Sequence, residues 1–259
     1  MVEIDPDWWK HLFDETYLIT DARSVCDDEL TCREVDFLEA ALGLKRHWPI
    51  LDLCGGQGRH SLELTRRGYT RVTVVDYSRF LIDSGRAKAD EEGLRIRFLK
   101  RDARDTGLPG ASFRVVFVMA SSLGYFMDDS QNQAILQETY RVLLPGGTLL
   151  LDLPNREYVM EHFSPQSWHE SGGGFVVCRQ RRLEKDVIYG REMLLSKRDG
   201  LIRDATYCTR LYSPENLRHM LIGAGFHWVS VERDFVSHEK RGDYGLMTNR
   251  MIAIANKGG

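Results

Sequence analysis

The sequence predicts an α/β fold built on a mostly parallel sheet, with an antiparallel insertion in its second half. Three observations predict this fold. Short apolar runs alternate with helical stretches over residues 35–153, this alternation stops between residues 155 and 211, and a helix with two strand-like segments then completes the chain. Alternating strands and helices form right-handed βαβ units whose strands lie parallel. We therefore expect a doubly wound sheet with helices on both faces.

A helix is predicted ahead of the first strand. Val35, Leu38 and Leu42 recur at the spacing of one helical face, and Gly43 is a suitable end because glycine readily adopts the left-handed conformation that closes helices. An aromatic stretch over residues 8–13 precedes this helix, and we expect it to form an amphipathic helix packed on the main domain. Residues 1–34 are assigned to an N-terminal helical cap segment.

Five short apolar runs predict the strands of the main sheet. Each is aliphatic or β-branched on consecutive positions, which is typical of strands buried on both faces. Before the last run, Ile135, Thr139 and Val142 follow a helical period, and the turn Pro145-Gly146-Gly147 ends that helix. Residues 35–154 form the predicted ligand-binding core. The five runs cover residues 50–53, 72–75, 96–99, 115–119 and 148–151.

Residues 155–211 have the pattern of an antiparallel meander inserted into the α/β fold. Strand-like segments cover 175–183, 187–197 and 201–211, and Asp199-Gly200 is a hairpin dipeptide. This insertion between the fifth strand and the last helix is long enough to be a lid over the active site, the arm of a homodimer, or both.

The last 48 residues, 212–259, complete the core. Ser213-Pro214-Glu215 supplies a helix cap, a proline for the first helical position and an acid in the first turn. An apolar stripe at helical spacing follows, and strands are predicted over residues 227–233 and 251–255.

Composition argues against several classes of function. Acidic residues outnumber basic ones, 38 to 35, whereas nucleic-acid binders usually carry a basic excess, so neither nucleic acid nor an anionic membrane is an expected partner. No apolar run approaches the ~20 residues that span a bilayer. The five cysteines form no Cys-x-x-Cys pair and the histidines show no metal-ligand spacing, so we expect no disulfide framework and no metal. Because the N-terminus lacks an apolar signal core, we expect a cytoplasmic protein.

The most informative stretch is the glycine-rich turn after the first strand, which reads Asp52-Leu53-Cys54-Gly55-Gly56-Gln57-Gly58-Arg59. Its glycines allow a tight turn and a close approach by a ligand, and the following helix start offers free N–H groups. Ser61 stands where a dinucleotide-binding turn has its third glycine, and the Walker sequence is absent as well. A plain glycine-rich turn is the alternative interpretation.

Two further acids end the next two predicted strands. Asp76 follows the second strand, where an acid can accept hydrogen bonds from both hydroxyls of an adenosine ribose. Asp102 follows the third strand and can accept a hydrogen bond from an adenine amino group. A single acid at a strand end is more often a helix cap. Together with Asp52, however, these acids lie along the sheet edge where α/β proteins bind their ligands.

With these residues in place, the sequence resembles the class I S-adenosylmethionine-dependent methyltransferases of the small-molecule type. Asp52, Cys54, Gly56 and Gly58 match the family's first motif, with Cys54 replacing a glycine. The resemblance is strong over about residues 35–153 and weaker in the last helix and strands. It implies a seven-stranded sheet of order 3-2-1-4-5-7-6 in which strand 7, over residues 251–255, is antiparallel.

The resemblance also implies S-adenosylmethionine as the cofactor. Asp76 matches the ribose-binding acid, Leu81 the residue packed on adenine, and Asp102-Ala103 the adenine-binding pair. Arg59 is a candidate partner for the cofactor's carboxylate, a solvated helix surface being the alternative, and Tyr17 is a candidate to close over the cofactor. The expected cofactor-binding residues are Tyr17, Asp52, Cys54, Gly55, Gly56, Gly58, Arg59, Asp76, Tyr77, Leu81, Asp102, Ala103 and Met119.

The acceptor is expected at residues 119–126, after the fourth strand. This segment lacks the Asn/Asp-Pro-Pro-Tyr tetrad of adenine-N6 and glutamine methyltransferases, and the Pro-Cys nucleophile of RNA cytosine-C5 enzymes is also absent, which favours a small-molecule acceptor. Tyr125 is the candidate catalytic residue; a packed aromatic at a loop corner is the alternative. Ser122, Tyr125, Arg210 and Tyr212 are the substrate-binding candidates, although Ser122 also suits a local backbone cap, and Arg210 and Tyr212 a fold-stabilising role.

Other functions stay open at this level. The same fold could act on RNA or protein, with the run Arg179-Gln180-Arg181-Arg182 as the docking surface, although alternate arginines on a strand point to opposite faces. A non-catalytic S-adenosylmethionine-binding module is a third possibility. The incomplete glycine fingerprint argues against a nicotinamide-dependent oxidoreductase.

Overall fold

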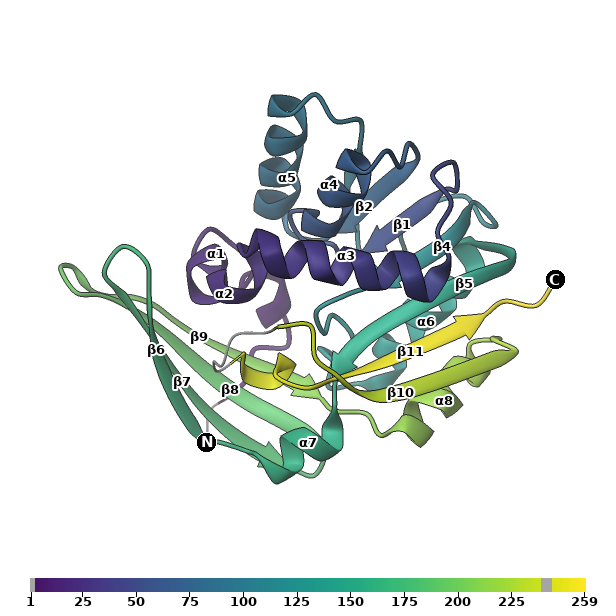
Figure 1. Ribbon diagram of the computed structural model, residues 1–259. Coiled ribbons are helices and arrows are strands. Elements are labelled where there is room, and N and C mark those ends of the chain that lie inside the picture. Colours follow the sequence, from purple (N-terminus) through teal and green to yellow (C-terminus); the bar gives the residue numbers. More distant parts are fainter. Residues whose placement is uncertain (1–2, 239–243) are drawn as a thin grey trace.

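A seven-stranded sheet forms the centre of the molecule in the computed structural model, which describes residues 3–238 and 244–259 (Figure 1). The strand order is β3-β2-β1-β4-β5-β11-β10, and β11 runs antiparallel to both of its neighbours. Counted along this sheet, β10 and β11 are strands 6 and 7, so the predicted order is confirmed. The strands are β1 (Ile50–Leu53), β2 (Val72–Asp76), β3 (Arg97–Lys100), β4 (Phe113–Val118), β5 (Leu143–Pro154), β10 (Trp228–Phe235) and β11 (Arg250–Asn256).

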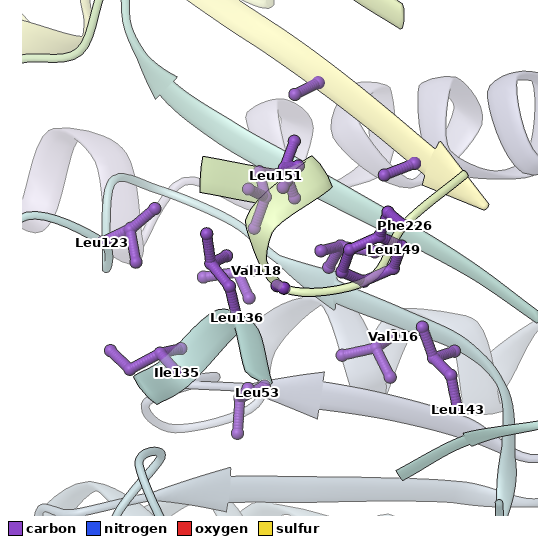
Figure 2. Packing of buried hydrophobic residues seen from close by; sticks show 14 of the residues in the cluster. Leu53, Val116, Val118, Leu123, Ile135, Leu136, Leu143, Leu149, Leu151 and Phe226 are labelled. Carbon is purple, nitrogen blue, oxygen red and sulfur yellow. The ribbon is translucent and has the colours of Figure 1, made fainter. Parts of the chain in front are cut away.

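Helices cover both faces of this sheet. On one face, α3, α4 and α5 pack against apolar side chains of β1, β2 and β4, such as Ile50, Val74 and Phe117. On the other face, α6 and α8 cover a larger cluster that includes Leu53, Val118 and Leu151; Figure 2 shows these side chains meeting between the sheet and the two helices. The helices are α3 (Asp28–Leu42), α4 (Arg59–Arg66), α5 (Arg79–Glu91), α6 (Asp129–Val142) and α8 (Pro214–Gly223).

Most predicted boundaries lie within a few residues of the observed ones, and β5 is the exception. It begins at Leu143, directly after α6, and runs through Pro145-Gly146-Gly147, which the sequence places in a turn. The first part of β5 pairs with Phe113 of β4 before a register shift, and Gly146 takes a positive φ of 69°. The turn is therefore an irregular start of the strand rather than a separate loop.

The insertion is a separate four-stranded antiparallel sheet of order β6-β7-β8-β9, preceded by the short helix α7 (Arg156–Glu161). Three strands match the predicted meander. The fourth, β6, was not predicted because its sequence Gln166–Ser171 contains one large apolar residue, Trp168, among polar ones. The strands are β6 (Gln166–Ser171), β7 (Phe175–Glu184), β8 (Val187–Ser196) and β9 (Gly200–Arg210).

The two faces of this insertion sheet differ. Val177 and Leu194, paired across β7 and β8, are fully buried on the inner face, toward the N-terminal segment. On the outside, Trp168 is 69% exposed and Leu201 is 56% exposed. The homodimer expected through this insertion stays a prediction.

The N-terminal segment is built differently from the prediction. The expected amphipathic helix over residues 8–13 is wrong: the structure has one 3-10 turn, η1 (Trp8–Lys10), followed by the short helices α1 (Tyr17–Thr20) and α2 (Ala22–Val25). Contacts of Trp8 and Trp9 with rings outside the segment replace the regular helical packing. The assigned boundary at residue 34 lies inside α3, whose end at Gly43, with φ of 54°, is as predicted. No helix among the described residues is long and apolar enough to cross a bilayer.

Candidate functional site

A pocket opens at the carboxyl ends of β1, β2 and β4, and the N-terminal segment covers it. Most of the predicted site residues meet there, whereas Gly58, Arg210 and Tyr212 lie outside its lining. The lining also contains residues that sequence reasoning did not assign to the site, among them Trp9, Phe13, His60 and Phe126. The predicted residues in the lining are Tyr17, Asp52, Cys54, Gly55, Gly56, Arg59, Asp76, Tyr77, Leu81, Asp102, Ala103, Met119, Ser122 and Tyr125.

The glycine-rich turn after β1 has a backbone that few residues tolerate. Cys54, Gly56 and Gly58 all take positive φ angles, of 60°, 58° and 72°. A side chain at Gly55 would place its Cβ 2.5 Å from Cγ of Asp52, so no larger residue fits there. Cys54, which replaces the family's first glycine, holds the left-handed conformation at an expected cost of about 1–2 kcal/mol.

Asp52 is a buried acid with one oxygen unused. Its side chain lies beneath the turn at 1% exposure, and its Oδ2 accepts a hydrogen bond of 2.8 Å from the Ser61 hydroxyl. Its Oδ1 is buried and has no hydrogen-bond partner among the described residues. Burial raises the pKa of Asp52 to about 7. A buried oxygen without a partner is expensive, and a donating or cationic group of a ligand would satisfy it.

Asp76 ends β2 and holds the glycine turn. One carboxylate oxygen accepts the backbone N–H of Gly56 and the other that of Ser78, each at 2.8 Å. Each oxygen keeps further acceptor capacity, because an ionised carboxylate offers about four lone pairs. Burial raises the pKa of Asp76, and the backbone hydrogen bonds, which favour the charged form, offset only part of this rise. The group therefore lines the pocket as an oriented acceptor for two neighbouring hydroxyls.

The Asp102 carboxylate, which the sequence predicts to be available to the adenine, is already hydrogen-bonded to Arg104. Arg104 donates to it from its backbone N–H and from its side chain, with Nε–Oδ1 at 2.9 Å and Nη2–Oδ2 at 2.5 Å. The Arg104 guanidinium also lies 4.6 Å from the ring centre of Phe126 and 5.0 Å from that of Trp9. Burial alone would raise the pKa of Asp102, but Arg104 lowers it. Asp102 keeps less acceptor capacity for a ligand than Asp76, since it accepts three hydrogen bonds from Arg104 whereas Asp76 accepts two from backbone N–H groups.

Arg59 belongs to a buried ion network behind the pocket. Its Nη2 lies 2.5 Å from Oε2 of Glu34, which also contacts His60 Nε2 at 2.9 Å, while the other Glu34 oxygen lies 2.6 Å from Arg250 Nη2. Arg59 is therefore not the solvated helix-surface arginine of the alternative interpretation. Its guanidinium is already paired with the Glu34 carboxylate. Burial lowers the pKa of His60 to about 4, so its ring is neutral at pH 7.

The segment after β4, where the acceptor is expected, is strained. Ala120 and Ser121 both take left-handed φ angles, 59° and 66°, without being glycine. Asp152 of β5 stabilises them: its carboxylate accepts the Ala120 N–H and its carbonyl accepts the Ser121 N–H, both at 3.0 Å. Arg250 in turn contacts the Asp152 carboxylate at 2.7 Å. Such strain is held at functional sites by the surrounding structure, and Asp152 had no signal in the sequence.

Aromatic side chains of the N-terminal segment form the outer wall of the pocket. The Phe13 ring stacks on Tyr125 at 5.8 Å and meets Tyr17 edge-on at 5.1 Å. Trp9 packs its edge against Tyr77 at 4.6 Å, and the Ser78 hydroxyl donates to the Phe13 carbonyl at 2.5 Å. The segment is thereby attached to the core at the point where the pocket begins.

Of the four substrate-binding candidates, Ser122 and Tyr125 line the pocket, whereas Arg210 and Tyr212 do not. Burial raises the pKa of Tyr125, so it stays a neutral phenol. Arg210 donates to the carbonyls of Gly124 and Met127, and Tyr212 donates to Asp129 at 2.6 Å. Both therefore support the loop that carries Tyr125, which is the fold-stabilising role that the sequence left open for them.

Comparison with known proteins finds that this chain is similar to methyltransferases. Residues 50–147 match the family described as Methyltransferase domain. A demethylmenaquinone methyltransferase of Thermus thermophilus is 34% identical over 179 residues, which cover 68% of this chain and 73% of the relative.

Solved structures show the same fold along nearly the whole chain. An S-adenosylmethionine-dependent methyltransferase from Clostridium acetobutylicum has a TM-score of 0.74 at 15% identity, with 94% of this chain and 97% of that one covered. The sugar N-methyltransferase KedS8 from Streptoalloteichus has a TM-score of 0.65 at 18% identity, with 92% and 91% covered. The insertion therefore falls within the length shared with both.

The unused oxygen of Asp52 leads to a prediction about stability. Folding raises the pKa of this acid from 3.8 to about 7, so the folded chain binds this proton more tightly than the unfolded chain and stability falls as pH rises across that range. Asp52→Asn removes the ionisation. We expect thermal denaturation to show the variant stabilised at pH 8 by up to about 4 kcal/mol and little changed at pH 4.

Asp83→Asn, at an exposed position on α5, is the control and should show no such pH dependence. A destabilisation of the Asp52→Asn protein that is the same at both pH values would contradict this account of the buried charge.

Proposed function

The chain belongs to the class I S-adenosylmethionine-dependent methyltransferases, and we propose that it binds S-adenosylmethionine in the pocket at the sheet edge and methylates a neutral amine of a small molecule. The observation that carries the proposal is the pairing of oriented carboxylates on the cofactor side with a neutral aromatic wall on the acceptor side. The bound cofactor supplies a methyl group that is already activated on a sulfonium. The residues of this chain then have to hold, orient and shield the reactants.

The cofactor side fits an adenosyl amino acid. Asp76 offers two oriented oxygens for the ribose hydroxyls, and Leu81 is a buried apolar side chain for the adenine face. The unpartnered Oδ1 of Asp52 suits an ammonium group, and the backbone at Gly56, where the nearest atom to an added Cβ is Leu81 Cδ1 at 3.6 Å, leaves space for a close approach. Asp52, Gly56, Asp76 and Leu81 are the four positions that we assign to cofactor binding with the strongest support from the geometry.

The acceptor side favours a nucleophile that needs no base from the protein. Tyr17 and Tyr125 have pKa values that burial raises, and the buried His60 has a pKa of about 4, so neither kind of group takes up a proton readily at pH 7. An amine can attack as the neutral form and lose its proton to water afterwards, whereas a hydroxyl or carbon acid benefits from a general base. Aromatic rings such as Phe13 also favour the cationic product.

The arginine run supports a small molecule rather than RNA. Arg179 pairs with Asp21 and Glu192, and Arg181 donates to the hydroxyls of Tyr207 and Ser167. These side chains are engaged within the protein, so the run does not present a continuous basic surface.

The named acceptors of similar proteins point in two directions. The Thermus relative is named for demethylmenaquinone, whereas the structural neighbour KedS8 is named for a sugar nitrogen. A quinone-type carbon acceptor is therefore the second candidate, favoured by the 34% identity to that relative. A panel of amines and reduced quinones, with product mass as the readout, decides between them.

Cofactor binding is tested by Asp76→Ala. Loss of two charge-assisted hydrogen bonds to the ribose should weaken the affinity for S-adenosylmethionine by about a hundredfold or more in calorimetry. Asp83→Ala, which removes an exposed acid on α5, should leave the affinity unchanged. A folded Asp76→Ala protein with undiminished affinity would refute the proposed ribose site.

On the acceptor side of the pocket, no described residue is a base that takes up a proton readily near pH 7; Asp52, whose pKa burial raises to about 7, lies on the cofactor side. With the cofactor saturating, this predicts how the rate depends on pH. With two acceptor amines whose own pKa values differ by about one unit, the midpoint of the kcat/KM profile should move by the same amount, because only the neutral amine reacts. An identical midpoint for both amines would instead reveal a titrating group of the enzyme, and the amine argument would fail.

A further inference from the structure

Two arginines on the inner face of the insertion sheet hold the segment that covers the pocket. Arg179 of β7 donates to the Thr20 carbonyl at 3.1 Å and to Asp21 at 3.0 Å. Arg203 of β9 donates to the Leu12 carbonyl at 2.8 Å and to Asp14 at 2.9 Å. The two arginines therefore bind both ends of residues 12–21, the stretch that carries the pocket residues Phe13 and Tyr17.

A single carboxylate holds both arginines. Glu192 lies on β8, the strand between β7 and β9, and is only 4% exposed. One of its oxygens lies 2.7 Å from Nε of Arg179, and the other lies 2.6 Å from Nη2 of Arg203. Removing this anion would leave two nearly buried cations without their shared partner, which is strongly unfavourable.

The insertion influences the pocket indirectly, through the contacts of Arg179 and Arg203 with the N-terminal segment. None of the described residues that line the pocket comes from residues 155–211, so the insertion is not itself the cover that the sequence suggested. The cover is the N-terminal segment, which Ser78 attaches to the core at Phe13 and Gln57 attaches at Val25. Between these two points, the charged contacts of the segment are with the insertion sheet.

We propose that Glu192 is a positioning residue for methyl transfer: by holding Arg179 and Arg203, it keeps residues 12–21 closed over the pocket and sets the place of the aromatic wall. This inference rests on the proposed binding of S-adenosylmethionine. It assigns the insertion sheet a role in the reaction although none of its side chains touches the reactants. In this proposal the segment moves away from the pocket when ligands exchange. The contacts of Glu192 with the two arginines, and of the arginines with residues 12–21, are called the clasp, and its strength governs how long a ligand stays bound.

The same two strands provide a matched control. Arg191 of β8 and Asp204 of β9 form an ion pair on the opposite face of the sheet, with their side chains 38% and 32% exposed. A surface pair of this kind contributes little to stability. Among the described residues, its side-chain hydrogen bonds join Arg191 to Asp204 and do not involve the stretch 12–21. Asp204→Asn therefore removes a carboxylate from the insertion without affecting the clasp.

The test is the dissociation rate of S-adenosylhomocysteine from the full-length protein, followed by the fluorescence of tryptophan, since Trp9 lines the pocket. Glu192→Gln keeps the shape of the side chain but removes its charge, and we expect dissociation to be about tenfold faster or more. Amide hydrogen exchange of residues 12–21 in the complex should rise in the same variant. Asp204→Asn should change neither quantity.

A second variant covers the case in which Glu192→Gln does not fold. The double variant Asp14→Asn/Asp21→Asn weakens the clasp from the side of the N-terminal segment and leaves the insertion sheet intact, and it should also release the ligand faster. Tight binding with unchanged dissociation in either folded variant, or equal acceleration by Asp204→Asn, overturns the role of Glu192. Failure of the unmodified protein to bind the probe would instead count against the proposed function.

Discussion

The hydrogen bond from the Gly56 N–H to Asp76 is the interaction on which the site depends. It joins the turn after β1 to the end of β2, so that two strand ends act as one rim. The turn reaches this acceptor only with a backbone that runs through positive φ at Cys54 and Gly56, and the close contact at Gly55 places Asp52 directly beneath it. A buried acid with an unpartnered oxygen is the result, and this arrangement favours ligand binding over stability.

Two parts of the chain that are far apart in sequence complete the pocket around this rim. The N-terminal segment supplies the aromatic wall, and the strained loop at Ala120 and Ser121 lies on the side that we propose for the acceptor. Both are held by buried ion networks: the loop by Asp152 and Arg250, and the segment by the arginines of the insertion sheet. Catalysis by orientation requires such rigidity, because the protein has to align reactants that are otherwise competent to react.

The sequence was sufficient for the sheet and the rim because both depend on local patterns. Buried parallel strands are continuously apolar, and a glycine turn at a strand end is visible in a single stretch of chain. Sequence reasoning failed where the partner is distant. Tyr212 and Asp129, or Asp152 and Ala120, meet only after folding. The strand β6 has too few apolar residues to give a pattern, and tertiary ring contacts override the helical spacing of Trp8 and Trp9.

A crystal structure of the protein soaked with S-adenosylmethionine tests the central claim most directly. We expect the ribose hydroxyls on the Asp76 carboxylate, the adenine beside Leu81, and a donor from the ligand, direct or through water, at the free Oδ1 of Asp52. An empty crevice beside Gly56, or a ligand without an adenosine bound there, would contradict the assignment of this rim as the cofactor site.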